Sequence, residues 1–107
     1  MYRIIFELRP KAGQEEAYIA QWQKGSDVIQ SYPGAHGTKL FRDPDMPDVL
    51  YAMAEWGSKE ARLAAMTKIK EERPDADIVL RGHEQYLDSH IILGEFECIA
   101  ESNPPLN

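Results

Sequence analysis

The spacing of apolar residues changes twice in the first part of the chain. Apolar side chains fill every second position from Tyr2 to Leu8, and this alternation predicts a half-buried strand over Tyr2–Arg9. Apolar residues then recur at helical spacing, which predicts a helix from Gln14 to about Ser31. Pro33-Gly34 ends this helix, because proline cannot continue it and glycine readily adopts a positive φ.

The middle of the chain predicts a hairpin followed by a second helix. Strands are expected over Ala35–Arg42 and Val49–Trp56, separated by a loop over the turn-forming residues Asp43–Asp48. Ser58 is a good N-cap for the next helix, and Pro74 closes that helix.

The last part of the chain has a weaker pattern. A short helix over residues 76–80 and a long final strand over Ser89–Ala100 are expected. We therefore predict one domain over residues 1–101 and a C-terminal tail over residues 102–107 that contains Pro104-Pro105.

The order of the predicted elements defines the expected fold. The order β-α-β-β-α-β is that of an α+β, ferredoxin-like domain with a four-stranded antiparallel sheet. Both helices would cover one face of this sheet and leave the other face open. A second copy of the chain is the simplest cover for that face, so we expect a homodimer.

Composition and charge exclude several classes of protein. The chain has 107 residues and a net charge of −6, which disfavours a nucleic-acid-binding surface. No apolar run approaches the ~18 residues of a membrane span, and the amino terminus lacks the pattern of a signal peptide. The lone Cys98, in the last predicted strand, cannot form an internal disulfide. A cytoplasmic protein without a membrane or nucleic-acid partner is therefore expected.

Several short motifs occur in an order that resembles the antibiotic biosynthesis monooxygenase (ABM) domain. They are Pro33-Gly34, the segment from Gly37 to Asp43, Leu50-Tyr51, and the segment from Glu55 to Ala61, which contains a Trp-x-Ser-x-Glu-Ala pattern. The resemblance extends over about residues 2–100. It implies a dimeric α/β barrel in which the two sheets face each other and each subunit keeps a cavity between its sheet and its helices.

The resemblance also implies a range of chemistries. Some ABM members oxidise phenols or quinols with molecular oxygen and use no metal or organic cofactor, whereas others degrade haem. The haem-degrading branch uses an asparagine, a tryptophan and a histidine where this chain has Glu7, Ala65 and the Pro74-Asp75 break. The implied function is therefore a cofactor-independent monooxygenase that acts on a small aromatic phenol or quinol.

Four aromatic residues are candidates for the substrate pocket: Trp22, Tyr51, Trp56 and Tyr86. An aromatic side chain at such a position can stack on a substrate or simply fill the core. Both interpretations stay open for Trp22 and Trp56 at this point.

His83 is the candidate catalytic residue, because a histidine can donate or accept a proton near neutral pH. The alternative for His83 is an exposed loop residue, and His90 is expected to be a strand-end residue. No metal site is predicted, since His83, Glu84, Asp88 and His90 match no known ligand spacing.

One departure from the family pattern supports a second hypothesis. Many ABM members carry a histidine late in the second helix, but that part of this chain reads Leu63-Ala64-Ala65-Met66. The alternative function is therefore a non-catalytic dimeric α/β barrel that binds a ligand or serves as a structural module.

Overall fold

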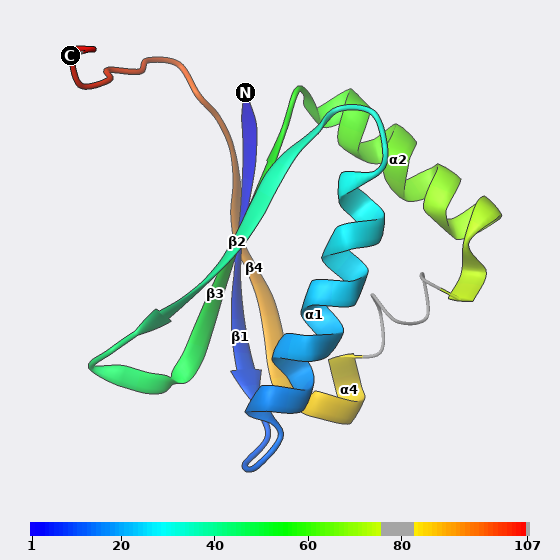
Figure 1. Cartoon of the computed structure of the whole chain (residues 1–107), viewed down its shortest axis with the longest axis vertical. Coiled ribbons are helices and arrows are strands. Elements are labelled where there is room, and N and C mark those ends of the chain that lie inside the picture. Colours follow the sequence, from blue (N-terminus) through cyan, green and yellow to red (C-terminus); the bar gives the residue numbers. More distant parts are fainter. Residues whose placement is uncertain (76–82, 107) are drawn as a thin grey trace.

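The computed structural model shows one four-stranded antiparallel sheet with its helices on a single face (Figure 1). It describes residues 1–75 and 83–106, except for the side chains of His83 and Glu84. The elements are β1 (Tyr2–Pro10), α1 (Glu15–Gln30), β2 (Ala35–Asp43), β3 (Met46–Trp56), α2 (Lys59–Glu72), α4 (His83–Tyr86) and β4 (Leu87–Glu97). Their order along the sheet is β2-β3-β1-β4, which confirms the predicted ferredoxin-like α+β fold.

The strand register decides which side chains face the helices. Ile4 of β1 lies opposite Ala54 of β3 and Glu95 of β4, so these three side chains share the helix-covered face. The buried residues on this side form two neighbouring clusters. One consists of Leu8, Tyr18, Leu50, Ala52 and Leu87, and the other of Tyr2, Ile4, Trp56 and Ala65.

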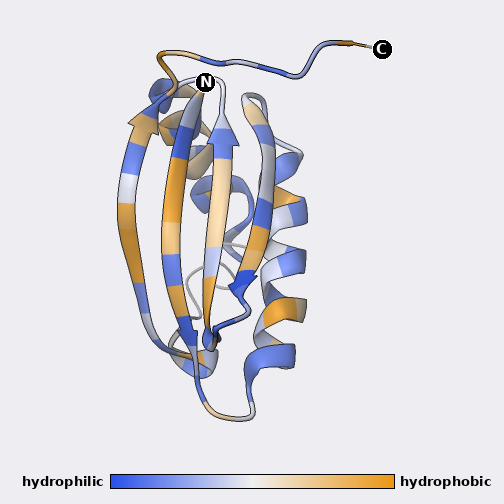
Figure 2. Cartoon of the chain, turned by 90° about the vertical axis from the view of Figure 1, so that its left-hand side faces the viewer, coloured by the Kyte–Doolittle hydropathy of each residue, from blue (hydrophilic) through white to orange (hydrophobic). Residues whose placement is uncertain are grey.

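The opposite face of the sheet, called the outer face below, is not covered by any helix of the described chain (Figure 2). Ile5, Met53 and Phe96 lie on it, because they alternate with residues of the helix-covered face. Arg3 and Glu55 form an ion pair on the same face. This face therefore combines apolar side chains with a few charged ones.

The start of α2 follows the predicted capping pattern. The Ala61 N–H donates a hydrogen bond to the Ser58 Oγ at 3.0 Å, so Ser58 satisfies one of the free N–H groups of the first turn. Glu60 lies in that turn, where its negative charge is favourable near the positive end of the helix dipole. These two residues explain why the helix begins directly after β3.

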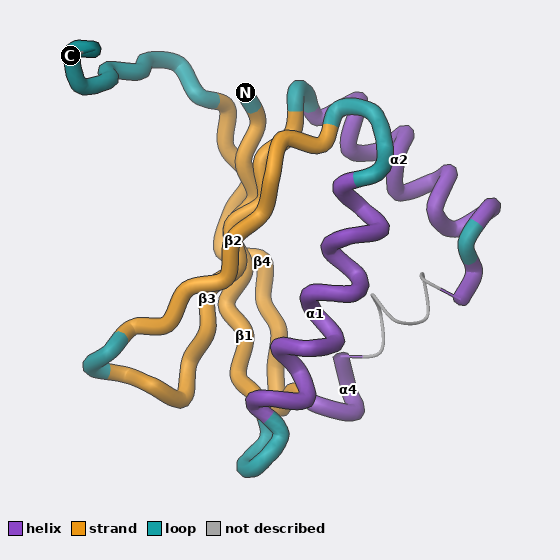
Figure 3. Tube along the Cα trace, viewed as in Figure 1, coloured by secondary structure: helices purple, strands orange, loops and turns teal. Residues whose placement is uncertain are grey.

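The hairpin between β2 and β3 is tighter than predicted (Figure 3). The expected loop over Asp43–Asp48 is wrong, because the turn consists of Pro44-Asp45 and strand pairing resumes at Met46 opposite Asp43. The Asp45 N–H donates to the Asp43 Oδ1 at 2.9 Å. Asp43 and Pro44 favour a tight turn, because the Asp43 side chain accepts a backbone hydrogen bond and proline fixes φ. The residues from Met46 onward are therefore free to continue as β3.

The last strand begins and ends earlier than predicted. β4 covers Leu87–Glu97. It ends at Glu97 because its partner β1 begins at Tyr2, which lies opposite Glu97. The Cys98 N–H still donates to the Met1 carbonyl at 2.8 Å, but Cys98 is exposed and the chain beyond it leaves the sheet (Figure 1). The helix predicted over residues 76–80 lies outside the described residues.

Candidate functional site

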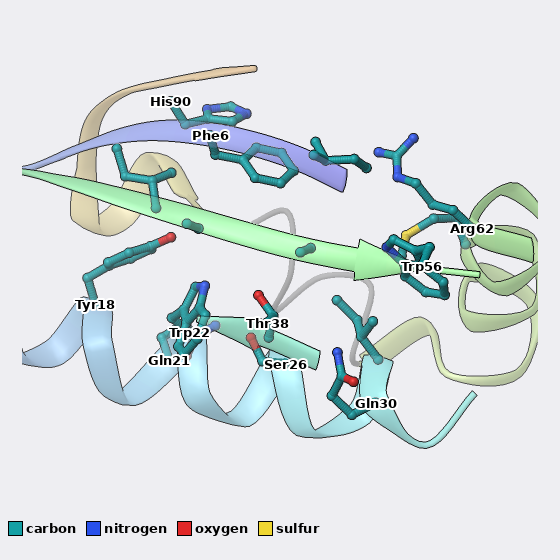
Figure 4. A pocket seen from close by; sticks show the side chains of 16 residues that line it. Phe6, Tyr18, Gln21, Trp22, Ser26, Gln30, Thr38, Trp56, Arg62 and His90 are labelled. Atoms are coloured by element: carbon teal, nitrogen blue, oxygen red, sulfur yellow. The ribbon is translucent and has the colours of Figure 1, made fainter. Parts of the chain in front are cut away.

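A cavity of about 190 Å³ lies between α1, the start of α2 and the helix-covered face of the sheet (Figure 4). Tyr18 lies at one end and Trp56 and Arg62 lie at the other, with the α1 side chains along one side and the strands along the opposite side. The cavity adjoins both buried clusters, so the core of the protein holds its walls in place.

One wall is a single row of side chains along α1. Tyr18, Trp22, Ser26 and Gln30 follow one another at intervals of four residues, which places them on the same face of the helix. Ile29 belongs to the same wall. This wall mixes aromatic, hydroxyl and amide groups, so it offers both stacking surfaces and hydrogen-bonding groups to a ligand.

The opposite wall is mostly apolar and consists of sheet residues: Ile4, Phe6 and Leu8 of β1, and Ala52 and Ala54 of β3. The space between the walls follows from the small size of the residues that face each other. Ser26 lines the cavity from α1, and Ala52 and Ala54 line it from β3, so larger side chains at these positions would fill the gap.

Several polar side chains border the cavity. The Gln30 Oε1 accepts a hydrogen bond from the Gly37 N–H at 2.8 Å, which fixes the amide at the start of β2, and Thr38 of β2 follows directly. Burial raises the pKa of Tyr18 to about 12, so its hydroxyl keeps its proton at neutral pH. The cavity therefore presents neutral donors to an oxygen atom of a ligand.

The other end of the cavity carries a charged group. The Arg62 Nη1 donates to the Glu95 Oε1 at 3.1 Å, and the Tyr2 hydroxyl donates to the same oxygen at 2.7 Å. Burial raises the pKa of Tyr2, and the hydrogen bond to Glu95 raises it further. Arg62 thus lines the cavity while Glu95 on the edge strand holds its guanidinium.

The structure places the predicted pocket residues in different surroundings. Trp22 and Trp56 both line the cavity, and Trp56 also belongs to the core, with 2% of its surface exposed. Tyr86 packs against the cluster around Leu8 rather than lining the described cavity. Tyr51 points away from the cavity, since it neighbours Ala52 on β3 and therefore lies on the outer face.

The histidines also differ from expectation. His83 begins the short helix α4, and its side chain lies outside the described residues, so its catalytic role stays a prediction. His90 is not a strand-end residue. It lies within β4 opposite Leu8, and it lines the cavity. Its position follows from the pairing of β4 with β1, which the sequence alone does not give.

The cavity residues that the sequence did not single out are mostly polar: Gln21, Ser26, Gln30, Thr38, Arg62 and His90. The four-residue spacing from Tyr18 through Trp22 could have indicated Ser26 and Gln30. Thr38, Arg62 and His90 come from three further elements, and no local pattern links them.

Residues 1–75 and 83–106 contain neither a cluster of metal-ligating side chains nor a membrane-spanning helix. No group of three or more His, Cys, Asp or Glu side chains there lies close enough to hold a metal ion. None of the helices in that part of the chain combines the length and the apolar character that crossing a membrane requires.

A family model described as antibiotic biosynthesis monooxygenase matches residues 1–69. The chain belongs to this family. The match includes β1, α1, β2, β3 and most of α2, and therefore every element of the cavity except β4. A comparison of the sequence with curated proteins finds no significant match.

Solved structures share the fold of this ABM chain over nearly its whole length. A candidate antibiotic biosynthesis monooxygenase from Chloroflexus aurantiacus is 24% identical, with a TM-score of 0.68 over 95% of this chain and 96% of that one. SnoaB, a cofactor-independent oxygenase from Streptomyces nogalater, is 14% identical, with a TM-score of 0.74 over 97% of each chain. Rv0793 from Mycobacterium tuberculosis is 13% identical, with a TM-score of 0.76 over 95% and 98%.

Proposed function

We propose that this ABM chain is a monooxygenase that oxidises a small phenol or quinol with molecular oxygen and without a cofactor. The observation that carries the proposal is the cavity itself, which two tryptophans and an apolar sheet surface enclose and which neutral hydrogen-bond donors border. SnoaB, which shares the fold, is a cofactor-independent oxygenase, and this supports the same reaction class here.

The proposed reaction needs no external reductant. When a phenol is converted to a quinone, one atom of O₂ bonds to a ring carbon and the other leaves as water, and the substrate supplies all four electrons. The protein would favour this reaction by stabilising the electron-rich phenolate that reacts with oxygen. Hydrogen-bond donors such as the Tyr18 hydroxyl and the Trp22 N–H lie on the α1 wall, where they can contribute to this stabilisation.

A proton acceptor for the phenol is also required. His83 is the residue that we propose from the sequence, and His90 is a second histidine that lines the cavity. Replacing each histidine separately with asparagine would identify the acceptor. The variant that lacks the acceptor should require a higher pH for the same rate, because the phenol must then lose its proton to solvent.

Oxygen uptake tests the reaction directly. Purified protein, treated with a chelator and checked for the absence of flavin or haem absorbance, would be mixed aerobically with a panel of hydroquinones and naphthols. We expect at least one compound to consume oxygen faster than in buffer and to yield a quinone that carries one added oxygen atom from O₂. Uptake no faster than in buffer across the whole panel would overturn the proposal.

Non-catalytic ligand binding is the second candidate function. The described α2, Lys59–Glu72, contains no histidine, although many family members have one late in this helix. The open cavity with polar groups favours ligand binding over a purely structural role, because a structural core would be filled. Tight binding of an aromatic ligand without oxygen uptake would support this candidate.

We further infer that the outer face packs against a second copy of the chain. Ile91 and Phe96 of β4 are each 51% exposed there, and the partly exposed Met53 of β3 lies on the same face. The Phe96 ring lies over Gly94, so that an added Cβ atom would lie 2.2 Å from the ring, and this gives β4 a broad apolar surface. In aqueous solution an apolar face of this kind is usually buried against another protein surface. Two identical faces can bury each other.

A further inference from the structure

The cavity differs in charge from the rest of the protein. The chain carries a net charge of −6, yet none of the described residues that line the cavity is Asp or Glu. Arg62 is the one permanently charged side chain among them. A cavity lining with a guanidinium and no carboxylate is suited to a ligand with negative charge, which would share Arg62 with the adjoining Glu95.

The position of Arg62 leaves part of its guanidinium for a ligand. Its Nη1 donates to Glu95, but a guanidinium carries five N–H donors. Tyr2 donates to the same Glu95 oxygen, so the carboxylate is held from two sides and in turn holds Arg62 at the end of the cavity. Arg62 itself is mostly shielded from solvent, with 20% of its side-chain surface exposed. A charged hydrogen bond in such a place is stronger than one at an open surface.

The volume of the cavity limits the size of the ligand. About 190 Å³ is only slightly more than the roughly 150 Å³ of an engineered apolar cavity that binds benzene. It is also below the roughly 300 Å³ at which pockets for drug-sized ligands begin. The Trp22 and Trp56 side chains line this space, so we expect one or two fused rings to fit and a third ring to exceed it.

We propose that the cavity binds a one- or two-ring aromatic ligand that carries an anionic oxygen, and that Arg62 holds this oxygen. The inference rests on the proposed function only in taking this cavity as the substrate site. It makes Arg62 a specificity-determining residue, and it makes Glu95 the positioning residue that sets how strongly Arg62 attracts an anion.

Three probes of graded charge and size test the proposal. Isothermal titration calorimetry would measure the binding of 2-naphthoate, its neutral counterpart naphthalene-2-carboxamide, and anthracene-2-carboxylate. We expect naphthoate to bind about tenfold more tightly than the amide, because a charge-assisted hydrogen bond is stronger than a neutral one. We expect the three-ring acid to bind at least about tenfold more weakly than naphthoate, because it exceeds the volume.

Variants of the charged pair separate an anchoring role from a structural one. Arg62→Gln should remove the preference for naphthoate over the amide, and Arg62→Lys should keep part of it. Glu95→Gln should strengthen naphthoate binding several-fold, because it removes a competing negative charge and keeps a hydrogen-bond acceptor. Arg42→Gln is the matched control, since Arg42 pairs with Glu15 at the start of α1, lines no part of the cavity and should leave all affinities unchanged when replaced.

Several outcomes would overturn the proposal. They are equal affinities for naphthoate and the amide in the unmodified chain, a preference that survives Arg62→Gln, or a preference that disappears in His90→Asn instead. His90 lies opposite Leu8 and Glu95 lies opposite Ile4, and these two β1 residues are four positions or about 13 Å apart. Anion binding at His90 is therefore distinguishable from anion binding at Arg62, which Glu95 holds. The probes are neither phenols nor quinols, so their binding does not depend on oxygen uptake. Failure of the Arg62 proposal is therefore distinguishable from failure of the proposed oxidation.

Discussion

Gly34 lies directly against Ala61 of α2. A Cβ atom built on Gly34 would lie 2.6 Å from the Ala61 Cβ, and the φ angle of Gly34 is +90°. The Gly34 carbonyl also accepts a hydrogen bond from the Gly57 N–H at 2.8 Å. The turn after α1 and the turn before α2 therefore touch, which brings Pro33-Gly34 and the Trp-x-Ser pattern together in the fold.

Gly34→Ala should lower the free energy of unfolding by about 2–5 kcal/mol. The positive φ costs about 1–2 kcal/mol for a residue with a Cβ atom, and the overlap with Ala61 adds a further 1–3 kcal/mol or so. Gly13→Ala is the matched control, because Gly13 has a φ of +78° but no atom within 4 Å of an added Cβ. Urea denaturation of both variants measures the difference, and equal losses would contradict the packing argument.

Ala54→Leu should close the cavity and leave the fold intact. Ala54 lies on the sheet wall between Ile4 and Thr38, so a larger side chain there would extend into the open space. We expect the cost in unfolding free energy to stay within about 1–2 kcal/mol, since the cavity accommodates the added methyl groups. Binding of 2-naphthoate, measured by calorimetry, should fall at least about tenfold.

The control for Ala54→Leu is Ala20→Leu, which makes the same exchange at an exposed position of α1. Ala20→Leu should bind 2-naphthoate like the unmodified chain. Undiminished binding in Ala54→Leu would mean that the ligand occupies another site.

Tyr18→Phe should change how stability depends on pH above pH 10. Burial raises the pKa of Tyr18 from 10.0 to about 12, so the unfolded chain loses this proton first as the pH rises. Below pH 10 both states keep the proton. Between pH 10 and 12 the free energy of unfolding then falls by about 1.4 kcal/mol per pH unit on account of this group.

Urea denaturation at pH 9 and pH 11.5 would measure this effect. The stability advantage of the unmodified chain over Tyr18→Phe should shrink by about 2 kcal/mol between the two pH values. Tyr2 and Tyr32, whose pKa values burial also raises, are present in both proteins and cancel from the difference. A pH-independent difference would show that Tyr18 is not held in its neutral form by burial.

Met53→Glu should dissociate the proposed dimer. Met53 lies on the outer face between Ile5 of β1 and Lys39 of β2, where a dimer would bury it. A carboxylate removed from water in the interface costs several kcal/mol even beside Lys39, and this cost is large enough to separate the two copies. Sedimentation equilibrium at micromolar concentration should give twice 12.2 kDa for the unmodified chain and 12.2 kDa for the variant.

Lys24→Glu is the control for Met53→Glu, since Lys24 is exposed on α1 and its replacement should keep the dimer mass. A mass of 12.2 kDa for the unmodified chain would show that the outer face is not paired.

Local patterns were sufficient for most elements and insufficient for most of the site. The alternation around Ile4 and the cap at Ser58 depend on neighbouring residues, and both predictions are confirmed. Tyr51 and His90 were assigned to the wrong surroundings, because the face that each residue occupies depends on strand register. Register is set by pairing between segments that are more than forty residues apart in the chain, so no short window of sequence contains it.

The sequence by itself determined the element order, the ferredoxin-like fold and the membership of the ABM family, since apolar spacing and turn residues are local properties. The tertiary structure alone decided that Ser26, Ala52 and Ala54 leave a cavity between them. It also decided that Arg62 reaches Glu95 at one end of that cavity. A void and a charge pair are properties of facing surfaces, and surfaces meet only after the strands are in register and the helices have packed on them.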